Sequence, residues 1–122
     1  MISKELLSAV YPIDETTETY VGIQESTGRV MWFGKEYNDC RSEIDIHRVA
    51  HKCKEWLYDN FYKLPRVSEC GSWHRMYFEK DNDAWFINIE WSDEQIYYSF
   101  RGETEPEAIF KACEWILTKD SK

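Results

Sequence analysis

The sequence has 122 residues, of which 43% are hydrophobic, 31% charged and 16% aromatic. This length suits a single domain, residues 1–122, that buries one core without disulfides, and the aromatic content excludes a disordered chain. The 15 basic and 23 acidic residues give a net charge of −8, which disfavours binding to nucleic acid or to anionic membrane surfaces. No stretch resembles a signal peptide or approaches the roughly 20 apolar residues of a membrane span, so we predict a cytoplasmic location.

The N-terminal third predicts a short helix followed by a β-hairpin. Residues 3–10 fit a helix that Ser3 caps and that ends before Pro12. Residues 19–24 and 29–37 are rich in strand-forming side chains, and Gly28 between them tolerates the positive φ of a tight turn.

The middle of the chain predicts a long amphipathic helix over residues 43–61. Its apolar residues recur at helical spacing and would form one face. They are Ile46, Val49, Ala50, Cys53, Trp56 and Leu57. Ser42 is the expected N-cap, and the pattern ends at Pro65, which begins a loop.

Residues 73–101 predict a three-stranded antiparallel meander. In its middle strand Trp85, Ile87, Ile89 and Trp91 alternate with Phe86, Asn88 and Glu90, a period of two that is typical of a half-buried strand. Polar turns at residues 81–83 and 92–94 separate the three strands.

A last helix is expected from Thr104, which forms a capping-box pattern with Glu107, while Pro106 suits the first turn. The predicted fold is therefore α+β. We expect one antiparallel sheet, made of the hairpin and the meander, packed against two main helices, with a short N-terminal helix in addition.

His47 and His51 are candidate metal ligands, because the i, i+4 spacing places two imidazoles on one side of a helix. Cys70 and His74 could complete such a site. The segment lacks the glutamate that follows the first histidine in zinc proteases, since Arg48 stands there. We favour two surface histidines and predict no metal and no cofactor.

Cys70, close to His74, is the one candidate nucleophile. An ordinary loop cysteine explains it more simply, and the sequence has no phosphate-binding glycine loop and no nucleophile-elbow motif. We therefore predict no catalytic residue and expect a protein that is not an enzyme.

The second face of the meander carries the predicted binding residues, Trp73, Tyr77, Phe86 and Tyr97. If no other element covers this face, it is an exposed aromatic patch of the kind that binds a partner. If the N-terminal hairpin or helix covers it, these residues form a second core layer. The acidic residues gather at the turns, where they serve solubility or present a negative surface to a basic partner.

From Glu43 onward the predicted order of helix, three strands and helix resembles the topology of the double-stranded-RNA-binding domain. That family places a lysine cluster at the start of its second helix to hold phosphates. Here the same place, residues 102–107, reads GETEPE. Carboxylates replace the phosphate contacts, so we reject RNA binding.

Three features resemble small uncharacterised proteins of bacteriophages and prophages, including those with a helix-sheet-helix sandwich. They are the segment IHRVAHKCKEW (residues 46–56), the Trp-rich strands, and the closing ETEPEAIFKACEWI (residues 103–116). The resemblance implies a phage or prophage origin and the same fold class. Because that group has no agreed activity, it transfers no functional residue.

Together these features predict a small acidic, non-enzymatic protein of phage or prophage type that binds a host or phage protein. One specific form is an inhibitor that mimics phosphate charge on a nucleic-acid-handling enzyme. The alternatives are a metal- or cysteine-dependent enzyme that uses His47, His51, Cys70 or His74, and a homo-oligomer that buries the aromatic face against a copy of itself.

Overall fold

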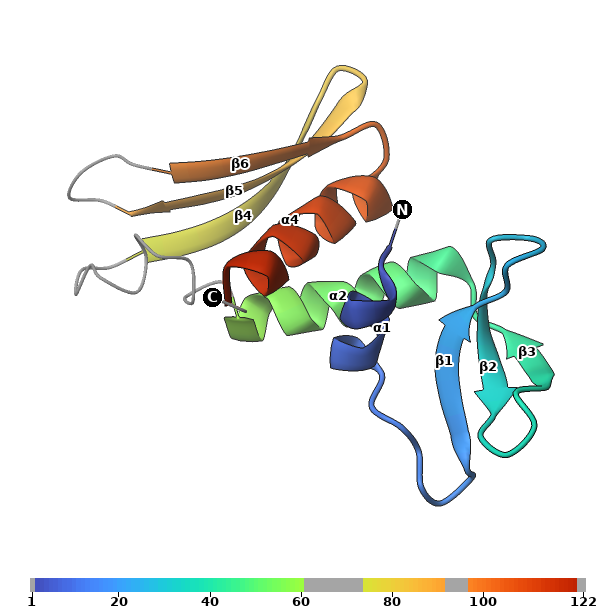
Figure 1. Ribbon diagram of the computed structural model, residues 1–122. Coiled ribbons are helices and arrows are strands. Elements are labelled where there is room, and N and C mark those ends of the chain that lie inside the picture. Colours follow the sequence, from blue (N-terminus) through green and yellow to red (C-terminus); the bar gives the residue numbers. More distant parts are fainter. Residues whose placement is uncertain (1, 61–73, 92–96, 121–122) are drawn as a thin grey trace.

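The computed structural model of the chain has an α+β fold and describes residues 2–60, 74–91 and 97–120 (Figure 1). The elements in chain order are α1 (Lys4–Val10), β1 (Thr19–Ile23), β2 (Val30–Gly34), β3 (Cys40–Glu43), α2 (Ile46–Asn60), β4 (His74–Asp81), β5 (Ala84–Trp91), β6 (Tyr97–Gly102) and α4 (Glu105–Asp120). The predicted fold class is confirmed.

The predicted meander forms a three-stranded antiparallel sheet in the order β4-β5-β6. Its register pairs Met76 with Ile89 on the inner face and Tyr77 with Asn88 on the outer face. Ile87 and Ile89 are buried, as the alternation in β5 predicts. Asn82 has a φ of 53° in the tight turn between β4 and β5, a conformation that asparagine tolerates.

The N-terminal hairpin belongs to a sheet of its own, which differs from the single sheet that we expected. β1 and β2 pair as predicted, and β3 then adds an antiparallel edge in the order β1-β2-β3. All four residues of β3 are exposed, so the strand lacks the apolar alternation by which sequence patterns are recognised. Its pairing rests on backbone hydrogen bonds and on an ion pair between Arg29 and Glu43 at 3.5 Å.

Because residues 40–43 form β3, α2 begins later than the predicted residue 43. Ser42, the predicted N-cap, lies within β3. The cap is instead Asp45, whose Oδ1 accepts a hydrogen bond from the backbone N–H of His47 at 2.8 Å. The buried face of α2 otherwise follows the prediction at Val49, Ala50, Cys53 and Leu57, whereas Ile46 is 43% exposed.

The helices join the two sheets. α4 contacts α2 and lies against β5 and β6, and the Tyr58 ring of α2 meets Phe78 of β4 at 5.9 Å. The first sheet lies at the other end of the helix pair, beside α1 (Figure 1). One continuous hydrophobic core includes buried residues from both sheets, among them Val21, Val30 and Ile89.

The predicted caps of the other helices are confirmed. Ser3 Oγ accepts from the backbone N–H of Leu6 at 3.1 Å, and Thr104 Oγ1 accepts from that of Glu107 at 3.2 Å. The Ser3 hydroxyl also donates to Glu114 Oε1 at 2.6 Å, so α1 is tied to α4. Of the helices that the structure describes, none has the length and apolar character needed to cross a membrane.

Candidate functional site

The sheet β4-β5-β6 turns one face toward the helices and the other face away from them (Figure 1). The register assigns eight described side chains to the second face, which we call the outer face: Tyr77, Glu79, Asp81, Ala84, Phe86, Asn88, Ser99 and Arg101. No helix or strand within the described ranges packs on it, and α1 and the first sheet lie elsewhere (Figure 1). The outer face is therefore open with respect to the described elements.

A hydrogen-bonded asparagine occupies the centre of the outer face. Asn88 is only 5% exposed, and its Nδ2 donates to Glu79 Oε2 at 3.2 Å. Ser99 Oγ donates to Asn88 Oδ1 at 2.8 Å. Both ends of the amide are thus engaged, which fixes the orientation of the side chain on the sheet. Sequence reasoning placed Asn88 on this face but did not single it out.

The structure brings together two of the four predicted binding residues. Tyr77 lies directly across from Asn88 in the register, and Phe86 lies two residues before Asn88 along β5. Both aromatic side chains are half-buried. Tyr97 lies opposite Glu90 in β6, with its side chain outside the described part, and Trp73 lies outside the described residues.

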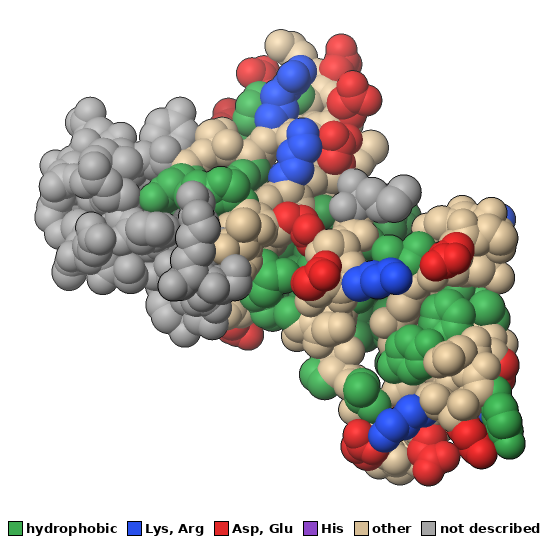
Figure 2. Space-filling model, in the orientation of Figure 1, with side chains coloured by type: hydrophobic (Ala, Val, Ile, Leu, Met, Phe, Trp, Pro, Cys, Tyr) green, Lys and Arg blue, Asp and Glu red, His purple; other side chains and the backbone are tan. Residues whose placement is uncertain are grey.

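Acidic side chains gather over the tip of the β4–β5 hairpin, next to the outer face (Figure 2). We call Glu79, Asp81 and Asp83 the acidic tip. All three are exposed, and none forms an ion pair with another described residue. The nearby cation Lys80 lies over the Trp85 ring at 5.3 Å. The carboxylates of the acidic tip are therefore not tied into ion pairs within the described ranges, although Lys80 and Arg101 are nearby cations.

A second acidic region lies around the turns of the first sheet, and it is partly neutralised. There Lys35 Nζ lies 2.9 Å from Glu15, and Arg41 Nε lies 2.6 Å from Asp39. These exposed pairs contribute little to stability, but each cancels one carboxylate charge locally. The two acidic regions consequently differ in how much charge they offer to a partner.

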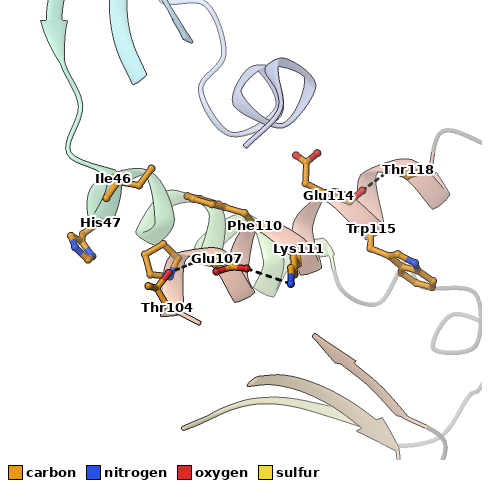
Figure 3. A pocket seen from close by; sticks show the side chains of 10 residues that line it. Ile46, His47, Thr104, Glu107, Phe110, Lys111, Glu114, Trp115 and Thr118 are labelled. Carbon is orange, nitrogen blue, oxygen red and sulfur yellow. Dashed lines mark hydrogen bonds and ion pairs between the residues drawn. The ribbon is translucent and has the colours of Figure 1, made fainter. Parts of the chain in front are cut away.

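A shallow groove of about 800 Å³ runs along the exposed side of α4 (Figure 3). It is lined by Thr104, Pro106, Glu107, Phe110, Lys111, Glu114, Trp115 and Thr118, with Ile46 and His47 at the start of α2. Its polar groups are engaged in structural contacts. Lys111 Nζ lies 3.5 Å from Glu107 and donates to the Arg101 carbonyl at 2.9 Å, and Glu114 holds Ser3.

This groove does not follow from the sequence pattern, because Phe110 and Trp115 lie at the edges of the apolar stripe of α4. The stripe consists of Ala108, Ile109, Ala112, Cys113 and Ile116. Phe110 is buried against the core, and the Trp115 ring packs against Tyr98 at 5.1 Å. The available sequence signal for the groove was that Phe110 and Trp115 are large apolar residues outside the stripe that covers the core. The groove is apolar without an unsatisfied charge directed into it, so its geometry indicates no particular chemistry.

Two of the four predicted metal candidates, His47 and His51, can be placed in the structure. His47 and His51 are exposed on α2, and His51 Nε2 lies 3.2 Å from Glu55 Oε1. Cys70 lies outside the described residues, as does the side chain of His74. Among the residues that the structure describes, no three His, Cys, Asp or Glu side chains are grouped to hold a metal ion.

Two of the cysteines, Cys53 and Cys113, are buried. The Cys113 thiol donates to the Cys53 carbonyl at 3.3 Å, and its contact with Cys53 together with burial raises the pKa of Cys113. A thiol that resists deprotonation is a poor nucleophile. Cys53 and Cys113 therefore belong to the core.

Comparisons of the chain with protein-family models, with curated proteins and with solved structures give no match. On the outer face and the adjoining acidic tip, half-exposed aromatics, a fixed polar centre and exposed carboxylates lie together. This combination suits the binding of another protein.

Proposed function

We propose that this chain is a non-enzymatic binding protein that holds a basic partner protein on the outer face and the acidic tip. The observation that carries this proposal is the arrangement around Asn88. Tyr77 and Phe86 flank a fixed hydrogen-bonded amide on a face that the described elements leave open. Aromatic side chains have few rotatable bonds and lose little conformational entropy on binding, so they are effective interface anchors.

The acidic tip indicates the charge of the partner. Exposed carboxylates next to an aromatic face attract lysine and arginine side chains, and they accelerate association over roughly 8 Å at physiological salt. Proteins that handle nucleic acid present such basic surfaces to phosphates. Inhibition of one of these enzymes in the cytoplasm, by a protein of phage or prophage type, is the specific form that we propose.

Affinity capture from nuclease-treated host lysate tests this proposal, with the partner identified by mass spectrometry. The informative variant is Asp81→Lys with Asp83→Lys, which reverses two charges of the acidic tip. Glu25→Lys with Glu36→Lys is the matched control, because it makes the same change in net charge at exposed turns of the first sheet. We expect a stoichiometric partner that the tip variant loses and the control variant keeps.

Equal loss in both variants would mean that only net charge matters, and equal retention would exclude the acidic tip. Tyr77→Ala with Phe86→Ala separates binding of a partner from self-association. If this variant abolishes capture but leaves the sedimentation coefficient of the purified protein unchanged, the aromatics bind another protein. If it converts an oligomer into a monomer, they bury against a second copy instead.

A further inference from the structure

A separate groove of about 550 Å³ lies between α2 and the first sheet, and its charge is opposite to that of the acidic tip. We call it the basic groove. It is lined by Tyr11, Trp32, Ile44, His47, Arg48, His51 and Lys52. None of these residues belongs to the outer face, so a ligand of the basic groove would bind independently of a partner on that face.

The floor of the basic groove is apolar and partly open to water. The rings of Tyr11 and Trp32 meet edge to face with their centroids 5.9 Å apart, and Ile44 beside them is buried. Tyr11 and Trp32 are half-buried, so part of each ring remains accessible. Such a surface gains free energy when an apolar side chain covers it.

The rim of the basic groove is cationic. Arg48 and Lys52 are exposed and one turn apart on α2, and neither forms an ion pair within the described ranges. Two like charges at this spacing disfavour the helix. Arg29, Lys35 and Arg41, by contrast, each pair with a carboxylate of the first sheet or of the segment before it.

Two charged residues of α2 act on the Tyr11 hydroxyl in opposite directions. Burial raises the pKa of the Tyr11 hydroxyl, the neighbouring Cys53 and Glu55 raise it further, and Arg48 lowers it. The Arg48 charge therefore acts on the floor of the groove. Glu55 lies at the His51 end of the rim, at 3.2 Å from that imidazole.

We infer that the basic groove binds an extended acidic segment of a partner protein. An apolar side chain of this segment lies over Trp32 and Tyr11, while its carboxylates meet Arg48 and Lys52. A second copy of this chain fits less well. Contact between the acidic tip of one copy and the basic groove of the next would be a head-to-tail interface. Unless its rotation closes a ring, such an interface produces open filaments.

Peptide binding measured by fluorescence anisotropy tests the inference. The probe is a short fluorescein-labelled peptide of alternating glutamate and leucine, and its control replaces each glutamate by glutamine. We expect the affinity of the glutamate peptide to fall as the salt concentration rises. The glutamine peptide should bind at least about tenfold more weakly. In parallel nitrogen-15 spectra, the indole N–H signal of Trp32, assigned with Trp32→Phe, should shift on binding.

The decisive variant is Arg48→Gln with Lys52→Gln, which we expect to weaken binding by roughly three- to tenfold. Lys35→Gln with Arg41→Gln removes the same charge from the first sheet and should leave the affinity within about twofold. Circular dichroism and thermal unfolding confirm that both variants remain folded. Both pairs consist of exposed side chains, so folding should be preserved.

Three results would overturn the inference. The first is equal binding of the two peptides, or a dissociation constant above about 1 mM. The second is an equal effect of the two double variants, which would point to net charge alone. The third is a change in the sedimentation coefficient of the free protein when Arg48 and Lys52 are neutralised. Such a change would mean that a second copy occupies the groove of the unaltered protein.

Discussion

Asn88 is buried in the middle of the outer face, although Tyr77, Phe86 and Ser99 around it are partly or fully exposed, and its amide is hydrogen-bonded at both ends. The alternation of β5 predicts which face the side chain lies on. It cannot predict burial, because burial depends on the residues that stand across from Asn88 on β4 and β6. Register is a tertiary property that turn geometry and neighbouring strands decide together.

Asn88→Ala is expected to lower the free energy of unfolding by about 1–3 kcal/mol, because two hydrogen bonds of about 0.5–1.5 kcal/mol are lost. Urea denaturation measures this change. Ser99→Ala removes only the bond to Asn88 Oδ1 and should cost about half as much. An Asn88→Ala variant as stable as the original would show that water satisfies Glu79 and Ser99 as well as the amide does.

The thiols provide a second prediction at the residue scale. Iodoacetamide should label Cys40, which is exposed, much faster than the buried Cys53 and Cys113. The raised pKa of Cys113 keeps its thiol protonated, and the thiolate is the reactive form. Peptide mapping after short exposures gives the three rates. Equal rates in the native protein would mean that α2 and α4 separate readily.

At the scale of elements, the sequence predicts those with a clear hydrophobic period. The meander, the hairpin and all three helices lie where the patterns place them, to within a few residues. The strand β3 and the separation of the sheets were not predictable in this way. An edge strand with four exposed residues has no apolar period, and the packing of the hairpin depends on its tertiary contact with α1.

Gly102 joins β6 to α4, and the junction leaves no room for a side chain. A Cβ at this position would overlap the backbone nitrogen of Ala108 and would lie 2.9 Å from the Thr104 carbonyl oxygen. Because these atoms are backbone, a rotamer change cannot relieve the overlap. Gly102→Ala should therefore lower the free energy of unfolding by about 1–3 kcal/mol.

Gly28→Asn is the matched control for this substitution. Gly28 has a φ of 74°, which asparagine tolerates, and a Cβ there would meet no atom within 4 Å. Its effect should stay within about 0.5 kcal/mol in the same urea denaturation experiment. A Gly102→Ala variant as stable as Gly28→Asn would contradict the close approach of β6 and α4.

At the scale of the whole molecule, the candidate site was only partly predictable. Tyr77 and Phe86 share a face because both strands alternate, and the sequence was sufficient for that. Whether the hairpin covers this face depends on where the first sheet packs, and it packs at the far end of the helices (Figure 1). The basic groove is lined by residues that are far apart in the sequence, such as Tyr11, Trp32 and Lys52. No local sequence pattern predicts that they lie together.

The continuous core predicts that both sheets unfold together. Val30→Ala in the first sheet and Ile89→Val in the second should each shift a single transition, because both residues belong to the same cluster. Losses of about 0.5–1.5 kcal/mol for Ile89→Val and somewhat more for Val30→Ala are expected. Circular dichroism and tryptophan fluorescence should give coincident urea curves, and two separated transitions would contradict a shared core.

The position of α4 has a consequence for synthesis on the ribosome. This helix packs on α1, α2, β5 and β6, yet every one of these partners precedes it in the chain. The apolar face of α2, with Val49, Cys53 and Leu57, is thus translated well before the helix that covers it. Until α4 emerges, that face is available to chaperones, so shortened nascent chains should be held in an incompletely folded state.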